Sequence, residues 1–252
     1  MVFAKQRADA PADFFAWEAA GLGWLAEATP SGGADVVGVV EVGDHGIVLR
    51  RVAETTATAA AAESFGRALV RTHMSGAPQF GVGPPGWSGD GYIGRQALVL
   101  QPFSRWGEFY AAVRLLPFAR AARQVGTLDE RGLSLVEALA QRLIAGEFDD
   151  GRPPSRIHGD LWAGNVLYAK SGAVLIDPAA HGGHGVTDIA MLDLFGTPFL
   201  GRVKAAYAEA AELPGDWSEL IGLHQLHPLL VHAVSHGPSY GRAARDVAAQ
   251  YT

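Results

Sequence analysis

The sequence contains no cysteine, and this absence excludes several kinds of chemistry. Disulfide bonds, thiolate nucleophiles and cysteine-ligated zinc sites all require thiol groups, so none of them can form here. Long apolar runs are also missing, because no stretch approaches the roughly 18 residues that a membrane-spanning helix needs. The first residues lack the apolar core and the small-residue cleavage site of a secretory signal. We therefore expect a cytoplasmic protein without a membrane partner.

Positive charge is in the minority. The chain has 20 Lys and Arg residues against 26 Asp and Glu residues, which gives a net charge of −6. Nucleic-acid phosphates attract basic surfaces, so we expect no nucleic-acid partner. Hydrophobic residues make up 48% of the 252 residues, enough to build a substantial core in one large domain or in two lobes. The oligomeric state stays open.

The most informative stretch is HGDLWAGNVLYAKSGAVLIDPA, residues 158–179. Two short apolar runs joined by a Ser-Gly turn predict a hairpin, which holds Asn165 and Asp177 near one end. Carboxylate and amide oxygens suit Mg²⁺, and nucleotide phosphates can complete its coordination shell. Asp160 then remains free to accept a hydroxyl proton. The alternative is an ordinary loop and hairpin with surface acids.

The order and spacing of these residues resemble a kinase catalytic loop, in which Asp and Asn stand five residues apart and a metal-binding Asp follows. Here Pro178-Ala179 replaces the usual Phe-Gly after that Asp. The combination of HGDLWxGN with DPA resembles the fructosamine kinase (ketosamine-3-kinase) family, part of the aminoglycoside-phosphotransferase-like kinases. The segment FGVGPPGWSGDGYIG, residues 80–94, extends the resemblance, which is strongest at residues 156–184.

The resemblance implies an α+β, two-lobed protein-kinase-like fold. A shortened β-rich small lobe with one helix would occupy residues 1–53. A large helical lobe, residues 54–252, would carry the catalytic loop and the metal-binding hairpin.

For the small lobe, the pattern predicts strands at residues 1–5, 36–41 and 46–50, and a helix at residues 14–27 capped by Asp13. The resemblance implies that Lys5 contacts the nucleotide phosphates and that Glu18 holds it in place. Taken alone, the pair would be a solvated ion pair worth at most about 1 kcal/mol. The backbone of the hinge at residues 50–52 (Arg50, Arg51 and Val52) would bind adenine.

Only four residues precede Lys5, whereas a kinase small lobe normally begins with two strands and a glycine-rich loop over the phosphates. Backbone N–H groups of such a loop would help to bind phosphate oxygens. Either the family member is naturally short, or the chain is truncated, or nucleotide is held without that loop. We expect weaker nucleotide binding, with the metal-binding and catalytic residues retained.

The large lobe is predicted to be mainly helical, with an irregular Gly- and Pro-rich segment at residues 80–93. Arg114 and Arg120 are predicted to be surface charges on a helix at residues 106–124. Asp188 either caps the helix at residues 188–194 or anchors the catalytic loop, and His158 holds that loop through hydrogen bonds. The other predicted helices span residues 56–74, 129–144, 205–212, 217–235 and 241–250.

The resemblance implies that Trp162 stacks against the substrate and that His232 faces the sugar. Core packing is the alternative for both. His224, His227, His232 and His236 share helical spacing, but no HExxH pattern is present, so we expect no bound transition metal.

The activity implied is ATP-dependent phosphorylation of a small-molecule ketosamine or glycated amine at O3, with Asp160 as the base and Asn165 and Asp177 holding Mg²⁺. One alternative is another phosphotransferase of the aminoglycoside- or choline-kinase type. The other is a noncatalytic kinase-like binding protein, which the missing loop and Arg50 would favour.

Overall fold

The computed structural model describes residues 1–252, and its strands form four small sheets. The first sheet is antiparallel and has the order β1 (Val2–Gln6), β4 (Gly46–Arg50), β3 (Val39–Gly43). Helix α1 (Phe14–Ala26) contributes Phe15 and Leu22 to a core that also contains Ile47 and Leu49 of β4. The first and last strands and the helix predicted for this region are confirmed.

Two local predictions in this region are wrong. Asp13 precedes α1, but it has a left-handed backbone with φ of 63° and its side chain makes no capping hydrogen bond. The strand expected at residues 36–41 is divided at Gly38, and its first part becomes β2 (Asp35–Val36). Strand β2 pairs in parallel with β9 (Gly172–Leu175), which is antiparallel to β8 (Val166–Ala169). The start of the chain is therefore joined to the predicted hairpin.

Two further strand pairs lie nearer the middle of the molecule. Strand β7 (Ser155–Ile157) pairs with β10 (His181–Gly183). The segment between these two paired strands contains the predicted catalytic loop and the hairpin. Strands β5 (Gly91–Ile93) and β6 (Gln96–Leu98) form a hairpin that the sequence did not predict. The irregular segment extends only to Asp90.

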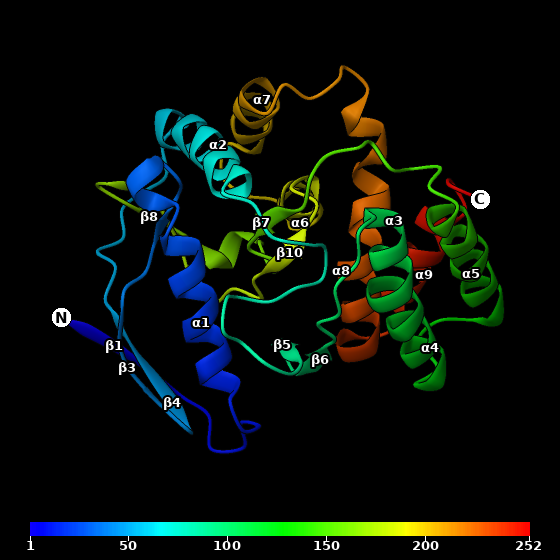
Figure 1. Ribbon diagram of the computed structural model, residues 1–252, viewed down its shortest axis with the longest axis horizontal. Coiled ribbons are helices and arrows are strands. Elements are labelled where there is room, and N and C mark those ends of the chain that lie inside the picture. Colours follow the sequence, from blue (N-terminus) through cyan, green and yellow to red (C-terminus); the bar gives the residue numbers. More distant parts are fainter.

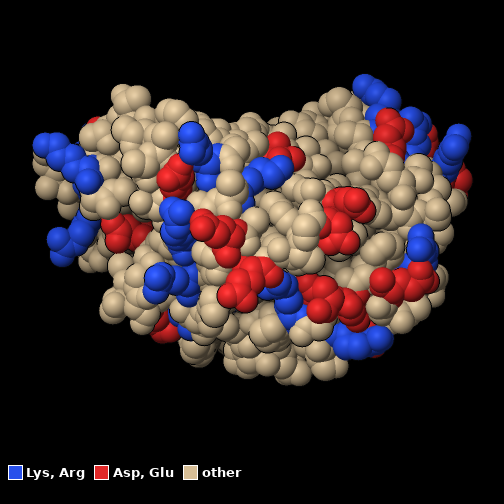
Figure 2. Space-filling view, turned by 90° about the horizontal axis from the view of Figure 1, so that it is seen from above, with Lys and Arg blue, Asp and Glu red and all other residues tan.

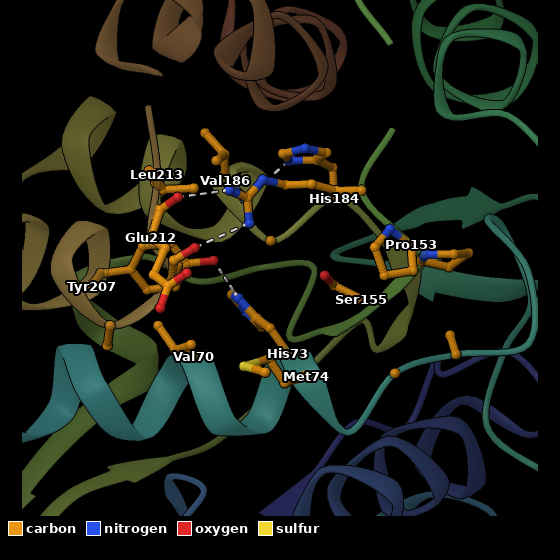
Figure 3. Close-up of a pocket in the computed structure, with 17 residues that line it drawn as sticks. Val70, His73, Met74, Pro153, Ser155, His184, Val186, Tyr207, Glu212 and Leu213 are labelled. Atoms are coloured by element: carbon orange, nitrogen blue, oxygen red, sulfur yellow. Dashed lines mark hydrogen bonds between the residues drawn. The ribbon is translucent and has the colours of Figure 1, made fainter. Parts of the chain in front are cut away.

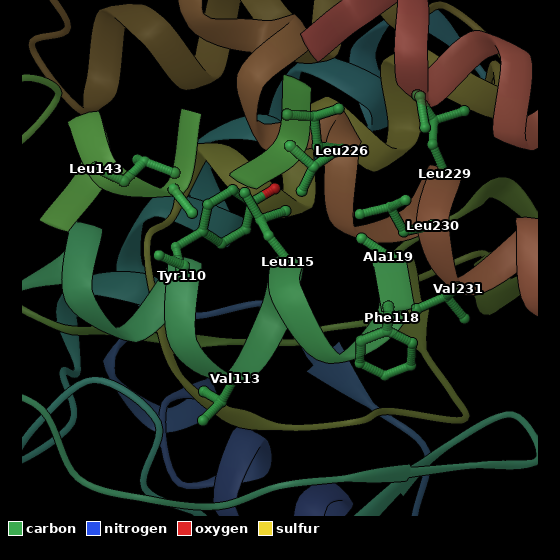
Figure 4. Close-up of a cluster of buried hydrophobic side chains, with 14 of the residues drawn as sticks. Tyr110, Val113, Leu115, Phe118, Ala119, Leu143, Leu226, Leu229, Leu230 and Val231 are labelled. Carbon is green, nitrogen blue, oxygen red and sulfur yellow. The ribbon is translucent and has the colours of Figure 1, made fainter. Parts of the chain in front are cut away.

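In Figure 1 most of the large-lobe helices lie on the right, α2 and α7 lie along the top, and α1 lies on the left beside the first sheet. The largest core cluster has 27 buried residues and joins α4, α5, α8 and α9 (Figure 4). Thr58 and Asp129 cap α2 and α5 through their side chains. The helices and helical turns are α2 (Ala59–Met74), α3 (Trp106–Phe109), a π-helical turn (Tyr110–Leu115), α4 (Leu116–Gln124), α5 (Glu130–Ile144), α6 (Val186–Phe195), α7 (Leu200–Ala210), α8 (Ile221–His236), α9 (Pro238–Ala248) and 3₁₀ turns at Thr29–Ser31, Ala163–Asn165 and Trp217–Leu220.

The prediction that Arg114 is a surface charge is wrong, whereas Arg120 is exposed as predicted. Arg114 is 1% exposed, its Nη1 donates to the Val99 carbonyl at 2.9 Å, and its guanidinium lies over the Phe109 ring. The π-helical turn explains the error, because an extra residue per turn rotates the following side chains relative to an α-helical pattern. Arg114 is thereby turned into the core.

Charged side chains of both signs are interspersed on the face shown in Figure 2, and no large area carries a single sign. None of the helices combines the length and the apolar character that crossing a bilayer requires. The lobe boundary at residue 53 stays a prediction.

Candidate active site

The loop between β7 and β8 is anchored by one buried carboxylate. Asp188 lies in the first turn of α6 and is 1% exposed. Its two oxygens accept hydrogen bonds from the backbone N–H groups of His158, at 2.7 Å, and Gly159, at 2.9 Å. His73 Nε2 lies 3.0 Å from the same carboxylate. Burial alone would raise the pKa of Asp188, but His73 and the loop amides hold it below its ordinary value. The carboxylate thus binds the loop rather than capping its own helix.

His158 is fully buried and uses both ring nitrogens inside the protein. Its Nδ1 accepts from the Asp160 backbone N–H at 3.2 Å, so Nε2 carries the proton that is donated to the Ile176 carbonyl at 2.8 Å. Burial lowers the pKa of His158, which favours this neutral form. The ring ties the loop to the strand that leads into Asp177, and it has no nitrogen left to act as a base.

The hairpin brings Asp160, Asn165 and Asp177 together, as the sequence predicted. Asn165 Nδ2 donates to the Asp160 carbonyl at 2.8 Å and to the Asp177 carbonyl at 3.3 Å. Asp177 has φ of 52°, a left-handed conformation that Asp tolerates better than most residues. Burial and the nearby Asp177 carboxylate raise the pKa of Asp160 to about 7. A carboxyl group with that pKa can exchange a proton near neutral pH.

Lys5 connects the first sheet to this hairpin. Its Nζ lies 2.9 Å from Glu18 Oε2 on α1 and 2.8 Å from Asp177 Oδ1. Burial lowers the pKa of Lys5, but the two carboxylates outweigh it and raise that pKa above its ordinary value. A charged lysine therefore stands beside the residue predicted to bind the metal.

Residues of this cluster line two separate cavities. One, of about 420 Å³, is lined by Lys5, Asp177 and the predicted hinge at residues 50–52. The other, of about 620 Å³, is lined by Asp160, Trp162 and His232. Asn165 donates hydrogen bonds to the backbone carbonyls of both aspartates, so it links one residue from the lining of each cavity.

Within the hinge, Val52 is the best placed to bind a ligand through its backbone. The N–H groups of Arg50 and Arg51 are already bonded to the carbonyls of Gly38 and Met1. Neither the N–H nor the C=O of Val52 has a partner in the chain. Arg50 and Arg51 line the cavity, but their backbone N–H groups are already bonded within the chain.

Trp162 and His232 both line the larger cavity. Trp162 is 44% exposed, so packing in the core does not account for it. Its ring lies against Gly164, where an added Cβ would overlap the indole. His232 Nδ1 is bonded to the Pro228 carbonyl at 2.8 Å, which leaves Nε2 without a hydrogen-bond partner in the chain.

His224 and His227 serve in packing, whereas His236 is exposed and lines the larger cavity. His224 is buried, stacks on Trp106 with ring centroids 4.6 Å apart, and bonds Thr187 Oγ1 at 2.9 Å. His227 is buried against Phe118.

Sequence reasoning missed His73, which supports the loop anchor from α2. Its Nδ1 lies 2.8 Å from the Tyr207 hydroxyl, and its Nε2 faces Asp188. Both rings line a third cavity of about 490 Å³ between α2, α7 and residues 152–155 (Figure 3). No sequence signal links His73 to His158, which follows 85 residues further along the chain. This cavity contains none of the predicted substrate or metal residues.

Comparison with known proteins agrees with this geometry. A family model described as "Fructosamine kinase" matches residues 1–252. A Thermus thermophilus protein provisionally named ketoamine kinase is 32% identical over 94% of this chain and 82% of its own length.

Solved structures extend the comparison. A Thermobifida fusca protein, provisionally named fructosamine-3-kinase, has a TM-score of 0.89 and 45% identity over 98% of this chain and 84% of that chain. An aminoglycoside phosphotransferase, solved with ADP and hygromycin B, has a TM-score of 0.60 at 15% identity over 93% of this chain and 83% of that chain. The predicted kinase-like fold is thus confirmed.

Proposed function

The chain belongs to the fructosamine kinase family, and on that premise we propose that it transfers the γ-phosphoryl group of ATP to the O3 hydroxyl of a ketosamine. The observation that carries the proposal is the position of Asp160 and Asp177. Each lines a different cavity, and the backbone carbonyls of both accept hydrogen bonds from Asn165. ATP would occupy the cavity of Lys5 and Val52, and the ketosamine would occupy the cavity of Trp162.

Asp160 would orient the acceptor hydroxyl and take its proton. The acceptor oxygen forms a bond to the γ-phosphorus while the bond to the β–γ bridging oxygen breaks. ADP leaves with that electron pair, and the proton goes to the Asp160 carboxylate. Phosphoryl transfer depends mainly on alignment and charge stabilisation, so this small group of residues suffices.

Asn165 and Asp177 fit Mg²⁺, because amide and carboxylate oxygens are ligands that this ion prefers. The Nδ2 group of Asn165 is engaged by the backbone carbonyls of Asp160 and Asp177, which leaves its Oδ1 without a hydrogen bond. When bound, Mg²⁺ would supply positive charge to the phosphate oxygens.

Lys5 would neutralise charge on the phosphates that are not transferred, while Glu18 fixes its position. We expect Lys5→Ala to lower kcat/KM for ATP by about 10²-fold, because one preorganised charge is lost. Steady-state kinetics at varied ATP concentration measure this effect. Lys170→Ala, in the exposed turn between β8 and β9, is the matched control and should behave like wild type. Equal kinetics for the two variants would contradict the role of Lys5.

Trp162 would stack against the sugar, and the ring depends on the absence of a side chain at residue 164. Gly164→Ala should displace the indole and raise KM for the ketosamine about three- to tenfold, the worth of an aromatic contact. The dissociation constant for MgATP should stay at the wild-type value, as measured by calorimetry. An unchanged KM for the ketosamine would show that the position of the Trp162 ring does not affect substrate binding.

The proposed activity is tested by incubating the protein with MgATP and a panel of alcohols. We expect ADP release with fructosyl-lysine and ribulosyl-lysine, and NMR of the product should place phosphate on O3. Turnover of an aminoglycoside or choline, without turnover of either ketosamine, would overturn the substrate assignment. If no acceptor reacts although the folded protein binds MgATP, the binding-protein alternative is favoured.

A further inference from the structure

The β5–β6 hairpin places one arginine on the rim of the larger cavity. Ile93 pairs with Gln96, so Gly94 and Arg95 form a two-residue turn, and Gly94 has φ of 57°. The hairpin is fixed to α1, because Trp17 Nε1 donates to the Tyr92 carbonyl at 2.9 Å. The backbone that carries Arg95 is therefore held in place.

The side chain of Arg95 makes no hydrogen bond and no ion pair within the protein. It is the only Lys or Arg that lines the larger cavity, and Asp160 is the only Asp or Glu. The remaining lining is apolar, aromatic or uncharged polar apart from His232 and His236. An acceptor that reaches Asp160 with its hydroxyl thus shares the cavity with one unpaired guanidinium.

We infer that Arg95 binds a carboxylate of the acceptor, so that the preferred substrates are ketosamines formed on the α-amine of a free amino acid. This inference rests on the proposed function and specifies its substrate class. A guanidinium presents parallel N–H donors that match the two oxygens of a carboxylate. In such a ketosamine the carboxylate carbon is two bonds from the amine nitrogen that carries the sugar. A glycated lysine side chain within a protein has no free carboxylate close to its amine nitrogen.

The test compares two acceptors of nearly equal size, fructosylglycine and fructosylglycinamide, which differ in the negative charge. Wild-type protein should have a KM for fructosylglycine that is about two- to fivefold lower, the range of an exposed charge pair. In Arg95→Ala the KM for fructosylglycine should rise to approach that for the amide, and Arg95→Lys should keep part of the preference. Arg120→Ala, a change at an exposed arginine on α4, is the control and should retain the full preference.

The salt dependence supplies a second readout. The wild-type preference should shrink between 50 mM and 500 mM NaCl, since exposed charges are screened. Equal KM values for the two acceptors in wild type, or an undiminished preference in Arg95→Ala, would overturn the inference and leave the proposed function standing. Absence of turnover with both acceptors would overturn the proposed function, and the inference with it.

Discussion

Replacing Asp160 by asparagine should lower kcat by about 10²–10⁴-fold, the usual contribution of a positioned general base. The substitution keeps the size of the side chain and removes its ability to take the acceptor proton. Nucleotide binding should be largely preserved, because the cavity lined by Lys5 and Val52 does not include Asp160. Single-turnover phosphoryl transfer gives the rate, and calorimetric titration with MgATP gives the affinity.

Two variants make this result specific. Asp44→Asn, in the exposed turn between β3 and β4, changes the same functional group far from either cavity and should leave kcat unchanged. Asp177→Ala should impair both nucleotide binding and turnover, because that residue lines the nucleotide cavity. If Asp160→Asn keeps a rate within about tenfold of wild type, another group must accept the proton.

The second large effect concerns stability. Asp188→Asn should lower the free energy of unfolding by about 3–5 kcal/mol, the cost of breaking a buried charged network. Asparagine leaves one of the two loop amides facing an NH₂ group, so a buried donor loses its acceptor. For a chain of this size the melting temperature should fall by about 6–20 °C in calorimetry. Asp193→Asn, at a partly exposed residue of the same helix, is the matched control with a small expected effect.

The pH dependence of the melting temperature distinguishes the effect of the Asp188 charge from the effect of its side-chain geometry. The pKa of Asp188 is lower in the folded protein than in the unfolded chain, where it is about 4. Its stabilisation is therefore complete above the unfolded value and is lost as pH falls through the folded value. The melting-temperature gap between wild type and Asp188→Asn should be constant above about pH 5 and should narrow below about pH 4. His73 and His158 face the carboxylate and are present in both proteins. A gap that persists in acid would show that geometry alone causes the loss.

Local sequence was sufficient to predict that the loop at residues 158–165 and the following hairpin bring the candidate catalytic and metal-binding side chains together. Asp160, Asn165 and Asp177 lie within 18 residues, and short strands with a Ser-Gly turn constrain where each one can point. Lys5 and Glu18 required the family resemblance, because strand and helix patterns do not specify which acidic residue will face a given lysine.

Contacts between residues far apart in the sequence could not be predicted from local sequence patterns. Arg114 was misplaced since a π-helical turn alters the rotation that an α-helical pattern assumes. The β5–β6 hairpin was missed because glycine-rich sequence normally disfavours strands; at Gly91 a side chain would overlap the Trp17 ring, so the glycine is required by packing. His73 reaches Asp188 only because α2 and α6 are brought together by tertiary folding.

The pairing of β2 with β9 has a consequence for local unfolding of the protein. The Val37 N–H donates to the Leu175 carbonyl at 3.0 Å, so a segment near the start of the chain completes the sheet that leads into Asp177. Separating the two would break this ladder and expose the edge of β9. In native-state hydrogen exchange, the amides of Val37 and of the β8–β9 hairpin should therefore gain and lose protection together, as members of one cooperative unit.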